Sequence, residues 1–351
     1  MEFEQFDFTL PKELIASAPA EPRDAARLFV YDTQTDTITF DTFHNIEKYI
    51  PKDALFVLNT SKVVPARIEV HKETGGKVEL LLLVNELRAG EMIIKSIADR
   101  KLTVGQKLSF PNREKLEVVQ QEEQFFYMKP LFPIEHIVEL LMRYGVTPIP
   151  KYLGESPLSE TELRARYQSV FATQPASVAA PTASLHFTSE LLEELRERGN
   201  SFASIALHVG MGTFAPVREE QIREGKLHRE QYIIPKETSE MLRLQEHTKK
   251  PIVAVGTTVM RALESAESAI LSNGTSTPII DSTEIFIRYP HHFMLADMMV
   301  TNFHIPQSSL MSLVDAFLRD KNAKRTILEL YAIAIKERFH FYSFGDAMLI
   351  V

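Results

Sequence analysis

Residues 177–214 read SVAAPTASLHFTSELLEELRERGNSFASIALHVGMGTF, a loop–helix–strand pattern that the rest of the chain is expected to serve. A loop of small residues leads to His186, and Thr188 is then the predicted N-cap of a helix with a leucine face that a glycine ends. Residues 202–209 form a predicted strand that carries His208 near its end. In an open α/β sheet, ligands bind at the carboxyl ends of strands, where such loops gather. The stretch therefore predicts an α/β domain with a histidine on each of two site loops.

Both histidines also have a plain structural interpretation. A histidine beside Leu or Phe is commonly a partly buried residue that bonds a backbone group. The Ala, Pro, Gly and Thr residues around them favour a functional interpretation, because small residues let the backbone approach a ligand closely. His186 and His208 are therefore candidate catalytic residues, and a purely structural role is the alternative.

Length and composition limit the class of protein. A chain of 351 residues exceeds the size at which one core usually stops growing, so we expect two domains. The hydrophobic share of 44% and the charged share of 25% are typical of soluble globular proteins, and no apolar run has membrane-spanning length. The acidic start MEFEQFDF is unlike the basic start of a signal peptide, and the lack of cysteine excludes disulfides and thiolate chemistry. We expect a cytoplasmic, monomeric enzyme that does not associate with membranes.

A second strand–helix unit follows the opening stretch. Residues 252–255 predict a strand, residues 256–258 (Gly-Thr-Thr) a tight turn, and residues 259–271 a helix. Such a turn exposes backbone N–H groups at the positive end of the helix dipole, which favours a polar or anionic ligand. An ordinary threonine N-cap is an equally open interpretation. The candidate substrate-binding residues of this unit are Thr258, Arg261 and Glu264.

The last part of the chain adds further candidates. Asp297, Asn302 and His304 are predicted to cluster around one strand end, and we expect them to bind substrate. Asp346 follows a glycine in a loop near the C-terminus, and it or Asp297 could act as an acid if its surroundings raise its pKa. The two adjacent histidines at 291–292 point apart on an extended segment, so they predict no metal site. Helices are predicted at 308–319 and 323–339.

After residue 67 the sequence pattern changes from alternating strands and helices to a series of short strands. Short strand-like segments separated by polar or glycine turns are typical of a small antiparallel barrel or sandwich. These segments are residues 77–84, 92–97, 107–110, 116–119 and 125–129. Helical periodicity returns at residues 134–144. We therefore predict a β-barrel domain at 68–149, inserted into a discontinuous α/β catalytic domain made of 1–67 and 150–351.

The charge is unevenly distributed. The net charge of −8, from 47 acidic and 39 basic residues, argues weakly against a nucleic-acid-binding protein. Residues 60–115, however, hold eleven Lys and Arg against seven Asp and Glu, which leaves room for a local basic surface. Runs of basic residues such as this one are more often solvated surfaces than binding sites. The candidate RNA-binding residues are Lys62, Arg67, Lys72, Lys77, Arg100 and Lys101.

Seven blocks of the sequence resemble one family. They are LNTSKVVPAR, ETGGKVELLLL, VAAPTASLHFT, LHVGMGTFAPV, AVGTTVMRALESA, VTNFHIPQSSLMSLVDAF and FYSFGDAMLI, which start at residues 58, 73, 178, 207, 254, 300 and 341. In this order they are similar to the S-adenosylmethionine:tRNA ribosyltransferase-isomerase family of queuosine biosynthesis. The resemblance extends over nearly the whole chain. It implies an α/β domain interrupted by a small β-barrel.

The resemblance also implies the reaction. The ribosyl part of S-adenosylmethionine is transferred and isomerised onto the aminomethyl group of 7-aminomethyl-7-deazaguanine in tRNA, which gives epoxyqueuosine-tRNA, adenine and methionine. The sulfonium acidifies the adjoining ribose methylene, so a base is needed there, and adenine leaves readily only when protonated, so an acid is needed too. Histidines that titrate near neutrality suit these steps, with Asp346 as a third catalytic candidate. S-adenosylmethionine is a substrate, and no cofactor or metal is expected.

Some positions depart from the family pattern. Ser184 stands where the family usually has glycine, and the segment around His291–His292 replaces a Tyr-Pro-Gly-Tyr segment. These departures leave an alternative open, namely a divergent paralogue that binds RNA without this catalysis or acts on a different acceptor. Four retained residues favour the enzyme, and we expect them to converge in one pocket: His186, His208, Arg261 and Asp346.

Overall fold

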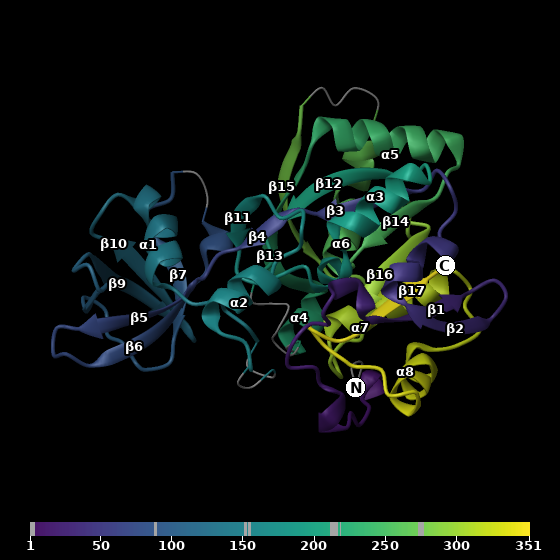
Figure 1. Ribbon diagram of the computed structural model, residues 1–351. Coiled ribbons are helices and arrows are strands. Elements are labelled where there is room, and N and C mark those ends of the chain that lie inside the picture. The colour runs from purple at the N-terminus through teal and green to yellow at the C-terminus, as the bar shows by residue number, and fades with distance from the viewer. Residues whose placement is uncertain are drawn as a thin grey trace.

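The computed structural model describes residues 4–87, 90–150, 153, 156–210, 217, 219–272 and 277–351. Figure 1 shows two bodies, a small barrel and a larger domain in which helices cover a mixed sheet. This architecture confirms the predicted fold class, an α/β domain combined with a small antiparallel β-barrel. Within the described ranges, no helix has both the length and the apolar character needed to cross a membrane.

The larger domain is built on one mixed sheet. In the described part of the chain its nine strands lie in the spatial order β15 (Ile279–Ile285), β13 (Lys226–Ile234), β12 (Ser201–Leu207), β3 (Leu55–Asn59), β14 (Ile252–Val255), β16 (Met298–Asn302), β17 (Ala347–Ile350), β1 (Arg27–Asp32) and β2 (Thr37–Thr42). The four strands β12, β3, β14 and β16 are parallel, and β17 is antiparallel to β16. The start of β17 therefore lies at the edge where the parallel strands end.

Helices cover both faces of this sheet because its central strands are apolar on both sides. One face packs on α5 (Lys236–Thr248), α6 (Thr257–Leu271), α7 (Ser309–Asp320) and α8 (Ile327–Lys336). The other face packs on α3 (Ser189–Glu197), η4 (Phe43–Lys48) and η8 (Thr182–His186). In β3, Leu55 and Val57 face the first layer, whereas Phe56 and Leu58 face the second. Each such buried side chain stabilises the fold by roughly 1.5–3 kcal/mol.

Helix α3 confirms the capping prediction. The Thr188 side chain accepts a hydrogen bond from the Leu191 backbone N–H at 3.1 Å, and Gly199 follows the helix with a φ of +104°. Helix α8 is shorter than the predicted 323–339. It begins at Ile327 because the side chains and backbone N–H groups of Thr326 and Glu329 form a reciprocal capping box.

The smaller body is a closed barrel. In the described residues its strands follow the order β10 (Phe125–Pro130), β7 (Ile94–Ala98), β6 (Lys77–Leu82), β5 (Arg67–Lys72), β8 (Lys107–Ser109) and β9 (Lys115–Glu122). Helix α1 (Ile137–Tyr144) adds three buried side chains to the barrel core. The chain enters and leaves the barrel at one point, where Val146 N–H donates to the Arg67 carbonyl at 2.7 Å. The boundaries 68–149 of an inserted domain stay a prediction.

A short two-stranded sheet lies between the two bodies (Figure 1). It pairs β4 (Ser61–Val63) with β11 (Gln174–Ser177) in parallel. The larger domain also contains the short helices α2 (Glu160–Arg166) and α4 (Glu219–Glu224). The 3-10 turn η5 (Val84–Glu86) follows β6 and packs against β13 and β11.

Candidate active site

The loop after β11 and the short helix η8 cross the carboxyl edge of the large sheet. Val178 N–H donates to the Val209 carbonyl beyond β12 at 3.1 Å. Further along, a Cβ placed on Gly256 would lie 3.6 Å from the Ala183 Cβ, so the turn after β14 and η8 are in contact. Gly256 has a φ of +94°, a conformation that favours glycine. One segment thus passes over the ends of successive parallel strands, where ligands bind in open α/β sheets.

The Asn302 cluster comprises Thr182, His186, Asn302 and Asp346. The Thr182 hydroxyl donates to Asn302 Oδ1 at 2.9 Å, and Asn302 Nδ2 lies 3.1 Å from His186 Nε2. Since the amide nitrogen is a donor, His186 Nε2 accepts. Burial lowers the pKa of His186 to about 4, although Asp346 partly opposes the shift. His186 is therefore neutral at neutral pH and a weak base.

Asp346 corrects an expectation. Its Oδ1 accepts the Arg27 N–H at 2.8 Å, its Oδ2 accepts the His340 N–H at 2.7 Å, and His340 Nδ1 lies 3.4 Å from Oδ2. Burial alone would raise the pKa of Asp346, but these hydrogen bonds outweigh it and lower the pKa. The role of an acid, for which Asp346 was a candidate, would require a raised pKa. The structure instead holds an ionised carboxylate that ties the start of β1 to the loop before β17.

Asn59, which was not among the candidates predicted from the sequence, connects three elements. Its Nδ2 donates to the Leu207 carbonyl at 3.1 Å and to Thr258 Oγ1 at 3.2 Å, and its Oδ1 accepts the Leu207 N–H at 3.1 Å. Because these bonds join β3, β12 and the first turn of α6, the candidate Thr258 is held by the scaffold. Its hydroxyl still lies at the strand ends, between the Asn302 cluster and the residues around Glu230.

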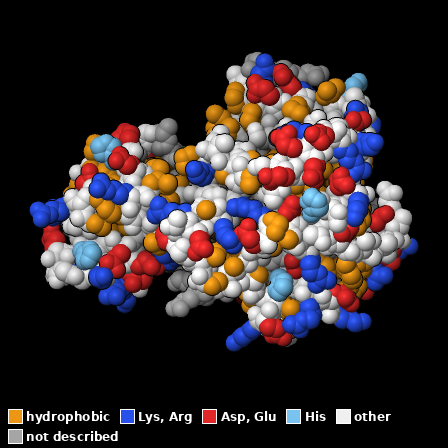
Figure 2. All heavy atoms as spheres, in the orientation of Figure 1, with side chains coloured by type: hydrophobic (Ala, Val, Ile, Leu, Met, Phe, Trp, Pro, Cys, Tyr) orange, Lys and Arg blue, Asp and Glu red, His pale blue; other side chains and the backbone are white. Residues whose placement is uncertain are grey.

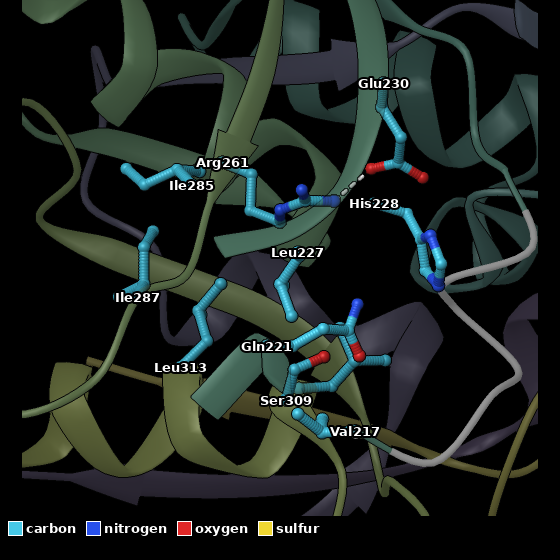
Figure 3. Close-up of a pocket in the computed structure, with 11 residues that line it drawn as sticks. Val217, Gln221, Leu227, His228, Glu230, Arg261, Ile285, Ile287, Ser309 and Leu313 are labelled. Atoms are coloured by element: carbon cyan, nitrogen blue, oxygen red, sulfur yellow. Dashed lines mark hydrogen bonds and ion pairs between the residues drawn. The ribbon is translucent and has the colours of Figure 1, made fainter. Parts of the chain in front are cut away.

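The Glu230 cluster comprises His208, Gly210, Glu230 and Arg261. Glu230 accepts the Gly210 N–H at 2.8 Å through Oε1 and pairs with Arg261 Nη1 through Oε2 (Figure 3). The side chains of Glu230 and Arg261 are 2% and 9% exposed. Within the described residues, Arg261 Nε and Nη2 and His208 Nδ1 have no hydrogen-bond partner. Burial lowers the pKa of His208, with the Glu230 charge opposing it, so this imidazole too is neutral at neutral pH.

A cavity of about 20 Å³ opens beside this cluster (Figure 3). Its lining includes Gln221 of α4, His228, Glu230 and Arg261, with apolar side chains from β13, β15 and α7. This volume holds roughly one water molecule. A nucleoside-sized ligand therefore needs the lining elements to move apart.

The remaining substrate-binding candidates are dispersed. Glu264 lies one turn beyond Arg261 on α6, and its Oε2 is 2.9 Å from His291 Nε2. Asp297 was expected beside Asn302, but it precedes β16 and bonds the Ile252 N–H at 2.9 Å, at the opposite edge of the sheet. That placement follows from strand direction, because Asp297 and Asn302 flank the same strand.

His304 lies in the core and does not face a ligand. Its Nε2 is 2.9 Å from Thr301 Oγ1, and its backbone N–H donates to the Tyr331 hydroxyl at 2.9 Å. Burial lowers its pKa to about 3. The structural interpretation of a lone histidine therefore applies to His304.

The four residues expected to converge form two neighbouring groups. His186 and Asp346 both lie against Asn302, whereas Arg261 and His208 both lie beside Glu230. Glu230 and His228 were missed because strand β13 was not predicted. Their signal in the sequence is a strand, KLHREQYII, whose Glu230 shares one face with apolar Tyr232 and Ile234. The Gly-Met-Gly turn after His208 lies mostly outside the described residues.

The basic candidates do not form one free cationic face. Arg67, Lys77 and Arg100 pair with neighbouring carboxylates, and Lys72 donates to the Lys101 carbonyl. Figure 2 accordingly shows basic and acidic side chains interspersed over the barrel. No group of three or more His, Asp or Glu side chains arranged to hold a metal occurs in the part of the chain that the structure describes.

Comparisons with known proteins give one consistent result. The family described as "Queuosine biosynthesis protein" matches residues 3–350. The S-adenosylmethionine:tRNA ribosyltransferase-isomerases of Carboxydothermus hydrogenoformans and Thermotoga maritima are 42% and 41% identical to the chain, each over 354 aligned residues and the full length of both proteins. A crystal structure of the S-adenosylmethionine tRNA ribosyltransferase from Thermotoga maritima aligns with a TM-score of 0.54 at 33% identity, covering 99% of this chain and all of that one.

Proposed function

The chain belongs to the S-adenosylmethionine:tRNA ribosyltransferase-isomerase family of queuosine biosynthesis, and we propose how its residues serve that reaction. The protein is an enzyme that transfers and isomerises the ribosyl part of S-adenosylmethionine onto 7-aminomethyl-7-deazaguanine in tRNA, with release of adenine and methionine. End-to-end identity of about 40% does not favour the alternative of a non-catalytic paralogue.

His208 is our candidate for the base that removes the proton from the ribose methylene next to the sulfonium. The observation that carries this assignment is a neutral imidazole whose Nδ1 is buried without a partner among the described residues. Such a nitrogen can accept a proton, and the nearby Glu230 carboxylate stabilises the imidazolium that results. His186 is less suited, because its Nε2 already accepts a hydrogen bond and its pKa is about 4.

The other roles are assigned by position. His228 lines the same cavity as Glu230, and we assign to it the protonation of the leaving adenine (Figure 3). His186 and Asn302, with Asp346 behind them, form a rigid, hydrogen-bonded wall that positions the nucleoside. Thr258 and Arg261 bind polar groups of the substrate.

The reaction as proposed uses no metal or redox cofactor, because the sulfonium itself provides the leaving group and the acidity. The partners are S-adenosylmethionine and tRNA that carries 7-aminomethyl-7-deazaguanine. We propose that a monomer suffices and that it acts in the cytoplasm, on its tRNA substrate. Lys62 and Lys101, whose side chains have no ion-pair partner among the described residues, are the first candidates for phosphate contacts.

The test is adenine release from S-adenosylmethionine with tRNA that carries the deazaguanine base. We expect His208→Gln to lower kcat on the order of a hundredfold or more, as for loss of a general base, with little change in thermal unfolding. His304→Gln is the matched control for a buried histidine outside the site, and it should lower stability more than kcat. Turnover near the wild-type rate in the His208 variant would contradict the assignment.

A further inference from the structure

Helix α6 carries two buried charged groups that are only partly paired in the part of the chain that the structure describes. Within the described residues, Arg261 Nε and Nη2 have no partner, and neither has Glu264 Oε1, one turn further along. Their side chains are 9% and 2% exposed, so water does not freely solvate them. Leaving such atoms unpaired costs free energy, more for charged groups than for neutral ones. Groups kept in this state are suited to bind a ligand.

The open atoms have a defined chemistry. Nε and Nη2 form one edge of the guanidinium, and their two parallel N–H groups match the two oxygens of a carboxylate. An ionised carboxylate such as Glu264 accepts hydrogen bonds from an ammonium group. Residues three apart on a helix are neighbours, with Cβ atoms about 5–6 Å apart. An α-amino acid carries a carboxylate and an ammonium on one carbon, and so complements both groups at once.

We propose that Arg261 and Glu264 bind the methionyl end of S-adenosylmethionine, with its carboxylate on Arg261 and its ammonium on Glu264. This inference rests on the proposed function, since the reaction supplies the α-amino acid. A tRNA phosphate fits less well, because it has no ammonium for Glu264 and Glu264 would repel it.

Two further residues position this pair. Glu230 binds Arg261 through Nη1, which leaves the Nε–Nη2 edge open, and His291 binds Glu264 through Oε2, which leaves Oε1 open. The guanidinium and the two carboxylates together carry a single negative charge. S-adenosylmethionine, with its sulfonium, ammonium and carboxylate, carries a single positive charge. Binding therefore neutralises a buried site, which limits the desolvation cost.

The test compares S-adenosylmethionine with its decarboxylated analogue, measured as binding of each to the full-length protein and as kcat/KM for adenine release. We expect wild type to bind S-adenosylmethionine about 10- to 100-fold more tightly than the analogue, as for a charged bidentate hydrogen bond. Arg261→Met should bind the two compounds about equally, and Arg261→Lys should restore only part of the preference. A second analogue, which lacks the amino group, tests Glu264. Glu264→Gln should bind this analogue and S-adenosylmethionine about equally.

The control is Arg325→Met, which removes a partly exposed arginine paired with Asp36 and should keep the wild-type preference. Thermal unfolding shows whether Arg261→Met is folded. If it is not, the binding preference of Arg261→Lys tests the inference. An unchanged preference in a folded Arg261 variant would overturn the inference. Failure of the wild type to release adenine from S-adenosylmethionine and tRNA would refute the proposed function, whereas the binding preference tests the inference independently.

Discussion

At the scale of single residues, the chemistry of each histidine is set by its partners. His186 and His208 are both buried and neutral, but His186 Nε2 accepts a hydrogen bond from Asn302, whereas His208 Nδ1 is buried without a partner in the described structure. His340 differs from both. Its hydrogen bond to the Asp346 carboxylate raises its pKa above the ordinary value of 6.5. Burial and neighbours thus decide whether a histidine accepts a hydrogen bond from an amide, is a candidate base or pairs with a carboxylate.

The His340–Asp346 pair predicts a pH dependence of stability. Because folding raises the pKa of His340, its contribution is fully present below pH 6.5 and is lost as pH rises through the folded pKa. In Asp346→Asn this dependence should disappear, so the stability difference between wild type and variant should be larger at pH 6 than at pH 8. We expect less than about 1 kcal/mol from this effect, because His340 is half exposed.

Urea unfolding at the two pH values measures this difference. The lowered pKa of Asp346 does not contribute in this window, because that carboxylate loses its stabilising effect only at acid pH. His340→Gln serves as a second variant and should flatten the dependence in the same way. An equal pH dependence in all three proteins would show that another group titrates.

At the scale of elements, the sequence predicted what local pattern controls. The leucine face and the Thr188 cap predicted α3, and residues 252–255 were predicted as the strand that is β14. Strand β13 was missed because its charged first half hides the alternation. The candidate site was predicted only where local sequence pattern marks its residues. Arg261 follows a recognisable turn, whereas the role of Glu230 arises from a contact with Arg261 that sequence spacing does not reveal.

The small volume of the cavity beside Arg261 predicts movement of α4. The cavity beside Arg261 has a volume of about 20 Å³, whereas ligand sites typically enclose about 300–1,000 Å³. Helix α4 contributes Gln221 to the lining and buries no residue of its own, so it is the element that separates at the lowest free-energy cost. We expect amide hydrogens of α4 to exchange rapidly in the free protein and more slowly with S-adenosylmethionine bound.

Hydrogen–deuterium exchange read by mass spectrometry measures this protection. Helix α5 is the control, because it packs on the sheet and contributes no residue to this cavity. Its exchange should be the same with and without S-adenosylmethionine. Equal exchange of α4 in both states would contradict a role for this helix in admitting the substrate.

At the scale of the whole molecule, an acidic protein has to bind a polyanion. The sequence located the excess of basic residues around the barrel, but it did not predict that Arg67, Lys77 and Arg100 would pair with nearby carboxylates. Exposed ion pairs of this kind contribute little stability, so a phosphate can replace the carboxylate. Lys62 lies on β4, in the short sheet between the barrel and the larger domain. A tRNA that reaches the strand ends from the barrel therefore passes close to it.

This arrangement predicts that tRNA affinity depends on salt and S-adenosylmethionine affinity does not. Phosphate contacts release counterions, so the logarithm of the tRNA binding constant should fall linearly with the logarithm of salt concentration. Replacing Lys62 and Lys101 together with alanine should reduce that slope by about 2, since each lysine that no longer binds a phosphate lowers it by roughly 1. Lys250→Ala, which removes a lysine paired with Asp53 at the opposite edge of the sheet, is the control and should leave the slope unchanged. S-adenosylmethionine binding is measured in the same buffers, because charges buried on α6 are screened far less than exposed ones. A tRNA affinity that is insensitive to salt, or equal slopes in the double variant and wild type, would place the tRNA on another surface.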